Sequence, residues 1–409
     1  MSHALSTLYK GSVKNLLGPA RANGTPALAF DYTEAYSVFD WGKMPDALKG
    51  KGQALAIIAA DWFEKLEKPE SWAEYSKTPQ ALSLRKGNRF GAAFNELGED
   101  LKQWGLRTHY LGALAGEHAV TCDESAQSAG LELKPIALSQ VKAPFSQIAV
   151  RQVSAVKPLI ATVLGRSVPD YSKTRTSPAP RLVPLEVVFR FGVPQGSSLL
   201  ERTARDPHYL AGLGFPELKA HAGEKWEFPV LELFTKLESS DRILSLSEAL
   251  AISGLNGMQL QEVLFKTAWV AGFLRYLCAR ADLDLADGKL EWGVGTDSQI
   301  FLVDAIGPDE LRILKGGVQI SKEFLRTHYR KSDWFEATTR AKEIAKSQGL
   351  SDWKKFVAVQ PQLLPADVRA LASQVYLSLA NELTQRRWFS DAWEMSRVVS
   401  ELKKYSVTP

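Results

Sequence analysis

Residues 289–306, which read KLEWGVGTDSQIFLVDAI, carry the pattern that decides the fold of this chain. Two runs with high strand propensity flank a Gly-Thr-Asp-Ser turn, and this arrangement predicts a β-hairpin. The hairpin contains two carboxylates, Glu291 and Asp304, among mainly apolar neighbours. Because side chains alternate between the two faces of a strand, the length of the turn decides whether these carboxylates lie together.

A turn centred on residues 297 and 298 places Glu291 directly across from Asp304. A turn over residues 295–298 moves the register by two positions and keeps both carboxylates on one face, whereas an odd-length turn separates them. On a shared face they repel each other unless a cation lies between them. Mg2+ binds a few carboxylates and keeps its other positions for water and phosphate, so it fits such a pair. The alternative is a solvent-facing hairpin whose acids are simply exposed.

The rest of the chain has strand patterns first and helix patterns last, which predicts an α+β fold rather than a doubly wound parallel sheet. Strand patterns occur at residues 7–9, 27–32, 183–190 and 227–237, and helix patterns at 51–68, 258–281 and from about 324 onward. The apolar stretch 258–285 is interrupted by charged residues and is predicted to be a core helix, not a membrane span. The proline-punctuated segment 171–184 is predicted to be an exposed loop.

Composition excludes several classes of protein. A chain of 409 residues predicts two or three structural units, and 45% hydrophobic with 23% charged residues is typical of a globular protein. The net charge of +4 suits anionic small molecules but does not indicate nucleic-acid binding. Cys122 and Cys278 form neither a CxxC motif nor a disulfide framework, and the first residues lack a signal-peptide core. We therefore expect a cytoplasmic protein with no membrane partner.

Common catalytic motifs are absent from the sequence: it has no GxxxxGK[ST], GxGxxG, HExxH, GxSxG or paired CxxC pattern. The six histidines are scattered singly, so each is predicted to have a surface or structural role.

Several cationic side chains suggest a site for anions. Lys322 and Arg326 are four residues apart, so on a helix they point the same way, and with Arg312 they could bind phosphate or carboxylate. The alternative is a basic solvated helix face with Glu323 as its internal partner.

Two glycine-containing turns are further candidates for phosphate binding. Arg190 precedes a turn that ends at Ser197 and Ser198, which suits a sugar phosphate, although an ordinary hairpin loop explains the composition nearly as well. The segment YKGSVK could place backbone amides and Lys14 over nucleotide phosphates.

Taken in order, these segments resemble the phosphoribosylaminoimidazole-succinocarboxamide synthase (SAICAR synthetase) family. The resemblance covers about residues 8–330 and not the helical tail. It rests on LYKGSVK (8–14), SVFDWGKMPDALKGKG (37–52), GLRTHY (105–110), VPLEVVFR (183–190) with GSS (196–198), LELFTKLESSDR (231–242), GKLEWGV (288–294), LVDAIGPDELR (302–312) and ISKEFLR (320–326).

The resemblance implies two α/β lobes related to ATP-grasp and kinase-like nucleotide domains, plus C-terminal helices. It implies an N-terminal lobe over 1–115, a central lobe over 116–325 with an insert near 123–180, and a helical segment over 326–409. The family uses ATP and Mg2+ to condense L-aspartate with carboxyaminoimidazole ribonucleotide (CAIR), giving SAICAR, ADP and phosphate through an acyl phosphate in purine biosynthesis. Partners are then small molecules, with no nucleic acid.

The resemblance also implies roles for individual residues. ATP contacts fall to Gly11, Lys14, Lys236, Lys289 and Glu291, metal ligation to Glu291 and Asp304, catalytic roles to Lys236, Asp241 and Lys289, and CAIR binding to Arg190, Ser197, Ser198, Arg312, Lys322 and Arg326. Ser12 replaces a usual lysine and Ala305 a usual acid, which indicates a divergent member. A small-metabolite kinase and a non-catalytic anion-binding module are the alternative functions.

Overall fold

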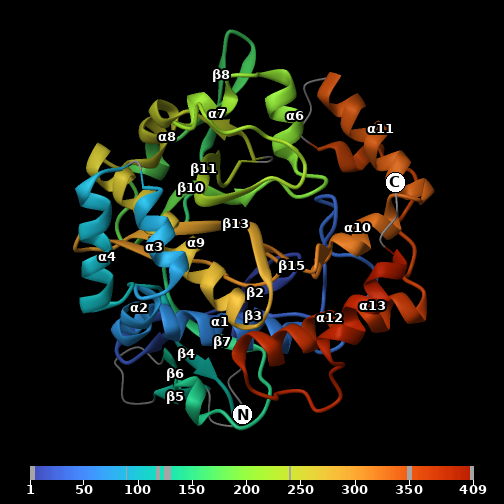
Figure 1. Cartoon of the computed structure of the whole chain (residues 1–409), viewed down its shortest axis with the longest axis horizontal. Coiled ribbons are helices and arrows are strands. Elements are labelled where there is room, and N and C mark those ends of the chain that lie inside the picture. Colours follow the sequence, from blue (N-terminus) through green and yellow to red (C-terminus); the bar gives the residue numbers. More distant parts are fainter. Residues whose placement is uncertain are drawn as a thin grey trace.

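The computed structural model describes residues 5–88, 90–116, 120–123, 130–238, 241–347 and 352–405. Two sheets dominate it: one lies in the lower part of Figure 1 and the other crosses the middle. In Figure 1 the helices after residue 322 lie together at the right of the molecule, and the helices of residues 69–104 lie at the left. The predicted mixture of strands and helices is confirmed.

The first sheet gathers strands from the beginning and the middle of the chain. Its order is β4-β7-β3-β2-β6-β5, with β1 paired to β2. The strands are β1 (Ser6–Lys10), β2 (Lys14–Ala22), β3 (Thr25–Tyr32), β4 (Tyr110–Leu114), β5 (Val120–Asp123), β6 (Gly130–Leu133) and β7 (Gln147–Arg151). The expected lobe boundary at residues 115 and 116 therefore falls inside this sheet.

The second sheet contains the predicted hairpin. Its order is β12-β11-β10-β13-β15-β16, with β14 paired to β13. The strands are β10 (Arg181–Gly192), β11 (Lys225–Thr235), β12 (Ile243–Leu244), β13 (Asp284–Val294), β14 (Ile300–Val303), β15 (Leu311–Lys315) and β16 (Val318–Gln319). Strands β10, β11 and β13 lie side by side and are almost fully buried, so this sheet forms the centre of the molecule.

Helices cover both sheets. They are α1 (Lys51–Glu67), α2 (Pro69–Tyr75), α3 (Pro79–Lys86), α4 (Ala92–Trp104), α5 (Ser172–Arg175), α6 (Ser198–Arg205), α7 (Tyr209–Gly212), α8 (Leu246–Ser253), α9 (Gly257–Arg280), α10 (Glu323–Tyr329), α11 (Asp333–Ser347), α12 (Ala366–Thr384) and α13 (Met395–Tyr405), with short 3-10 turns at Leu138–Gln140 and Trp353–Phe356. No helix in the described ranges combines the length and apolar character that a bilayer crossing requires.

Two long helices form the core against the sheets. Helix α1 packs on β3, β4 and β7 on one side and on α12 on the other, while α9 packs on β10, β11 and β13. The start of α9 is fixed by a capping box between Asn256 and Gln259. Most of its residues are buried, which confirms the prediction of a core helix.

Two details of the sequence prediction are wrong. Strand β2 lies between the strand patterns predicted at residues 7–9 and 27–32, and the sequence analysis missed it. The exposed loop was predicted to extend to residue 184, but β10 already begins at Arg181. The guanidinium of Arg181 is buried and donates to the carbonyl oxygens of Ser253 and Gly254, at 3.0 and 2.8 Å.

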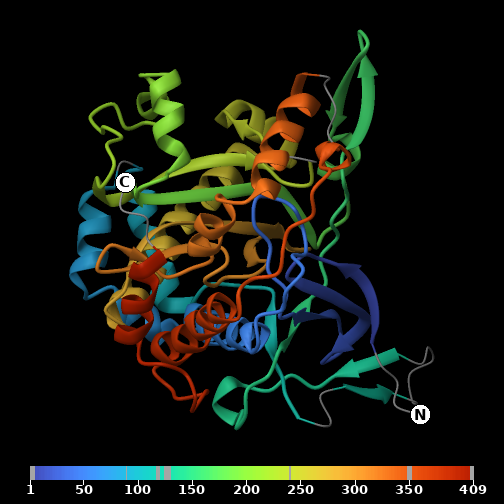
Figure 2. The same ribbon diagram turned by 90° about the vertical axis from the view of Figure 1, so that its right-hand side faces the viewer.

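The expected insert near 123–180 has two different parts. Strands β6 and β7 belong to the first sheet, whereas β8 (Leu159–Val163) and β9 (Arg166–Asp170) form a separate two-stranded hairpin. This hairpin projects from the body of the molecule, as Figure 2 shows.

Candidate active site

The acidic hairpin has a register that the sequence did not predict. Glu291 pairs with Val303, and Val294 pairs with Ile300, so the turn contains the five residues 295–299. An odd-length turn should place Glu291 and Asp304 on opposite faces. However, β14 ends at Val303, and Asp304 adopts a left-handed backbone conformation with φ of 66°. Its carboxyl group lies close enough to that of Glu291 for each to affect the pKa of the other.

The two carboxyl groups have opposite protonation preferences. Burial, followed by the charge of Asp304, raises the pKa of Glu291 to about 8. Burial also disfavours the charge of Asp304, but Lys14 and Lys236 outweigh it and hold the pKa of that carboxyl below its usual range. At neutral pH the pair therefore carries close to one negative charge, and a divalent cation placed there would favour loss of the second proton.

Two lysines approach this pair from separate strands. The ammonium group of Lys14, at the start of β2, forms an ion pair with the carboxylate of Asp304. The Lys236 Nζ atom, just after β11, lies 2.5 Å from Glu291 Oε1. The turn before Lys14 requires a glycine at position 11, because a Cβ atom there would lie 2.4 Å from the carbonyl oxygen of Lys14.

Glu186 and Glu310 extend this cluster, and the sequence analysis assigned neither to the site. Glu186 on β10 pairs directly with Glu291 on β13. Lys289 Nζ lies 2.8 Å from Glu186 Oε2 and 3.1 Å from Glu310 Oε2. Glu186 also lies 3.7 Å from Lys236, so lysines alternate with carboxylates through the cluster.

Two adjoining cavities open on this cluster, with volumes of about 110 and 390 Å3. They share Val13, Lys289, Asp309 and Glu310 in their walls. The smaller cavity is also lined by Lys14, Lys236 and Asp304, and the larger one by Ser12, Asp40, Arg312, Lys322 and Arg326. The structure thus brings together the predicted nucleotide-side lysines and the three predicted anion-binding side chains.

The cations of the larger cavity differ in how they are held. Arg326 lies 2.8 Å from Glu323, as the alternative interpretation of this segment expected. Arg312 lies 3.5 Å from Asp287. The ammonium group of Lys322, at the N-terminal end of α10, has no hydrogen-bond or ion-pair partner among the described residues.

Asp309, which lines both cavities, connects them to α1 and α12. Its Oδ2 atom lies 2.8 Å from Nζ of the fully buried Lys51, and its Oδ1 atom accepts a 2.6 Å hydrogen bond from the Tyr376 hydroxyl. The sequence prediction missed this contact, because a lysine at the start of a helix is usually solvated.

The other predicted substrate residues do not line these cavities. Arg190 is buried, with Nε 2.5 Å from Glu232 and Nη1 3.1 Å from Asp287. Asp287 lines the larger cavity, and Arg190 contacts Asp287 without lining the cavity itself. Ser197 caps α6 and Ser198 accepts a 2.6 Å hydrogen bond from Arg202.

Asp241 lies near the lysine–carboxylate cluster without a direct contact to it. Loss of hydration and the charge of Glu186 raise the pKa of Asp241, whereas Lys289 and Lys236 lower it. These effects place its carboxyl group within electrostatic reach of both lysines.

The donor set at the hairpin fits Mg2+ that arrives with a nucleotide. Across the described part of the chain, no group of three or more His, Cys, Asp or Glu side chains is arranged to hold a metal ion. Glu291 and Asp304 offer two carboxylates beside a cavity lined by lysines. Mg2+ is commonly held by one or two carboxylates, with water and substrate phosphates at its other positions.

Comparison with known proteins identifies the family. The SAICAR synthetase family model matches residues 145–341. A putative phosphoribosylaminoimidazole-succinocarboxamide synthase from Archaeoglobus fulgidus is 32% identical over 396 residues, covering 96% of this chain and 99% of that protein. A phosphoribosylaminoimidazole-succinocarboxamide synthase from Thermoplasma acidophilum is 28% identical over 51% of this chain and 69% of its own length.

A solved structure shows the same fold. The SAICAR synthase from Saccharomyces cerevisiae, complexed with SAICAR, aligns with a TM-score of 0.55 at 16% identity, over 94% of this chain and 96% of that one. The near-complete match to the Archaeoglobus protein extends beyond residue 330, where the sequence blocks ended. Together with the common fold, it shows that this chain belongs to the SAICAR synthetase family.

Proposed function

We propose that this protein is an ATP-dependent ligase that condenses L-aspartate with CAIR to give SAICAR, ADP and phosphate in purine biosynthesis. The observation that carries the proposal is the adjacency of two cavities: one is lined by Asp304 and three lysines, with Glu291 beside it, and the other by three further cations. Such a pair of sites suits a nucleoside triphosphate beside an anionic substrate, and the family membership of the whole chain supports this reading.

The smaller cavity would receive the phosphates of ATP. The proposed contacts come from the glycine turn at Gly11 and from Lys14, Lys236 and Lys289, with Glu291 on the same side. These lysines now neutralise carboxylates, so phosphate oxygens could take over part of their interactions. Mg2+ held by Glu291 and Asp304 would offset charge on the phosphates, as in other phosphoryl-transfer sites.

The larger cavity would bind CAIR. Arg312, Lys322 and Arg326 supply positive charge for its phosphate and carboxylate groups. Arg190 would act on this substrate through Asp287, which it holds from behind. Ser197 and Ser198 complete the proposed phosphate loop, and their hydroxyl groups would have to exchange their present contacts for the substrate.

The reaction needs the CAIR carboxylate to become an electrophile. Attack of a carboxylate oxygen on the γ-phosphorus forms an acyl phosphate and releases ADP. The amine of L-aspartate then attacks the acyl carbon, loses a proton and expels phosphate, which leaves an amide. Lys236 and Lys289 are proposed to stabilise charge on the transferred phosphoryl group, and Asp241 to face the reacting substrates. Holding both partners in register can contribute on the order of 7–11 kcal/mol.

The proposal is tested by measuring ADP release while each reactant is omitted in turn. We expect ADP only when CAIR, L-aspartate and Mg2+ are all present, with SAICAR formed in equal amount. ADP release that does not require L-aspartate would instead indicate a kinase. Salt-sensitive nucleic-acid binding without ADP release would indicate a binding module.

We also propose a boundary between the two lobes and a cellular compartment for the protein. Because β7 belongs to the first sheet, we place the lobe boundary between residues 151 and 181 rather than at 115, with the helical segment starting near 326. Cys278 is a buried free thiol, which is compatible with the reducing cytoplasm where such a pathway enzyme would meet its small-molecule partners.

A further inference from the structure

Asp304 reaches Glu291 only because its backbone leaves the strand conformation. The register pairs Glu291 with Val303, so an extended Asp304 would point to the opposite face of the hairpin. Its φ of 66° is uncommon for a residue other than glycine. Such a conformation persists when the surroundings determine it, and observed cases cluster at functional sites.

The imidazole of His109 contacts the backbone at this point. His109 Nε2 lies 3.0 Å from the carbonyl oxygen of Asp304. A carbonyl oxygen can only accept a hydrogen bond, so Nε2 must carry the proton and the ring must be its Nε2–H tautomer. The salt bridge to Lys14 holds the side chain of Asp304, whereas His109 holds its main chain.

The ring of His109 is itself held firmly. Its side chain is buried and makes edge-to-face contacts with the rings of Phe30 and Phe63. The distances between ring centroids are 5.2 and 5.4 Å. The main chain of His109 donates to the carbonyl oxygen of Leu302 at 2.9 Å and accepts from Arg151 at 2.6 Å. The main chain of His109 is therefore hydrogen-bonded both to β14 and to the first sheet, which fixes the position of its imidazole donor.

We propose that His109 is a positioning residue, whose Nε2–H bond to the Asp304 carbonyl oxygen keeps the backbone left-handed and the carboxylate beside Glu291. The inference rests on the proposed Mg2+ site, which it explains in structural terms. Without this bond, Asp304 can relax to an extended conformation that carries its carboxylate away from Glu291.

Three substitutions separate this role from simple core packing. In His109→Gln the amide nitrogen can reach the former Nε2 position and donate. In His109→Asn the same amide is too short to do so, and in His109→Leu no donor remains. Gln and Asn thus form a matched pair that differs in reach and not in chemistry.

Binding of Mn2+ with a non-hydrolysable ATP analogue, measured by electron paramagnetic resonance of the Mn2+–nucleotide complex, gives a readout that does not require activity. We expect His109→Asn and His109→Leu to weaken Mn2+ binding by about tenfold or more, which is the usual range for groups that orient metal ligands. His109→Gln should bind nearly as wild type does. Turnover should follow the same order, while KM for CAIR changes little.

The control is Asp304→Asn, which should remove Mn2+ binding. If it does so while His109→Asn binds Mn2+ as wild type does, the positioning role is wrong and the metal assignment stands. If Asp304→Asn retains full binding, the metal assignment fails and this inference with it. Nitrogen NMR of the wild-type imidazole needs no variant: an Nε2–H tautomer supports the proposal, and an Nδ1–H tautomer overturns it.

Discussion

Glu186 and Glu291 occupy directly opposed positions on β10 and β13, and Lys236 interacts with both of them. Like charges across a pair of strands are destabilising unless something neutralises them. Lys236 lies 2.5 Å from Glu291 and 3.7 Å from Glu186, so one ammonium group serves two buried carboxyl groups. The cluster is therefore held together by the cations that we propose for ATP binding.

Lys236→Met tests whether this ammonium group acts on the reaction. The substitution keeps the apolar stem and removes the charge, so we expect turnover to fall on the order of 100- to 1000-fold, as for loss of one charge-stabilising donor. The fold should survive, because Glu291 can remain protonated and so avoid repulsion by Glu186. Steady-state kinetics and thermal melting measure the two effects.

A matched control is Lys225→Met, which removes an equally long side chain from an exposed ion pair with Asp284. Exposed pairs contribute little, so its turnover and melting temperature should stay close to those of wild type. Equal turnover in both variants would remove Lys236 from the catalytic machinery.

The raised pKa of Glu291 predicts a specific pH dependence of stability. Because the folded-state pKa of Glu291 is about 8, against an ordinary value of 4.5, folding favours the protonated form. The unfavourable contribution of Glu291 is absent below the unfolded pKa and grows as pH rises from 4.5 to about 8. In Glu291→Gln without Mg2+, the free energy of unfolding should therefore rise relative to wild type across this interval. Urea denaturation at several pH values measures it, and a constant difference would contradict the raised pKa.

Arg190→Ala should lower the stability of the folded protein, in addition to any effect on substrate binding. The guanidinium is buried between Glu232 and Asp287, so its removal leaves Glu232 with Arg202 alone and Asp287 with Arg312 alone. We expect a loss of about 3–5 kcal/mol in the free energy of unfolding, as for other broken buried ion pairs. Urea denaturation provides the measurement. Arg205→Ala, at an exposed position of α6, should lose very little, and a similar loss in both variants would exclude a buried role for Arg190.

The sequence predicted local structure well and long-range placement less well. The alternating pattern gave the hairpin, and the helical spacing gave α1 and α9, because periodicity reflects which face is buried. The register could not be read from it, since alternation does not reveal a five-residue turn or a left-handed Asp304, whose carbonyl oxygen contacts His109, 195 positions away. A single buried histidine has no sequence pattern that separates it from an ordinary core residue.

The same limit applies to the site. Lys14, Lys236 and Lys289 were assigned to one nucleotide side by resemblance, and they do line a common cavity. Glu186 was not predicted for the site, because nothing local indicates that β10 pairs with β13. Arg190 at a strand end looked available for a ligand, whereas Glu232 and Asp287 on adjacent strands already surround it.

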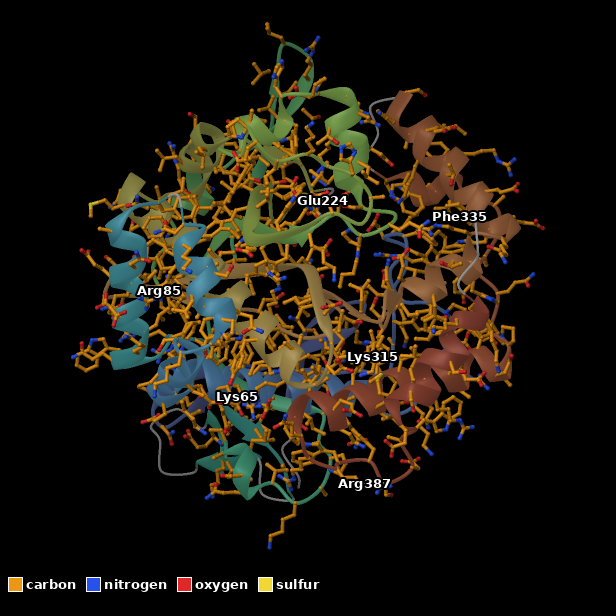
Figure 3. All side chains as sticks on the ribbon, in the orientation of Figure 1. Lys65, Arg85, Glu224, Lys315, Phe335 and Arg387 are labelled. Atoms are coloured by element: carbon orange, nitrogen blue, oxygen red, sulfur yellow. The ribbon has the colours of Figure 1, made fainter. Side chains whose placement is uncertain are left out.

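Helix α11 supports one wall of the larger cavity. Phe39 and Asp40, which line this cavity, both have left-handed backbones with φ of 55° and 60°. Lys342 Nζ donates to the Phe39 carbonyl oxygen at 3.1 Å and to Asp40 Oδ2 at 3.0 Å. The ring of Phe39 lies 4.6 Å from that of Phe335, which is labelled on α11 in Figure 3. Because this conformation is unfavourable by itself, we expect it to depend on the helix.

Lys342→Met tests whether α11 shapes the substrate site. Loss of both donors should let residues 39 and 40 relax and displace the cavity wall, which we expect to raise KM for CAIR on the order of tenfold. The melting temperature should change little, since Lys342 is partly exposed. Lys346→Met, at a more exposed position of the same helix, is the control and should leave KM unchanged. Lys342→Arg should restore part of the affinity because it again donates to Phe39 and Asp40. If KM for CAIR is the same in Lys342→Met and Lys346→Met, helix α11 does not contribute to this site.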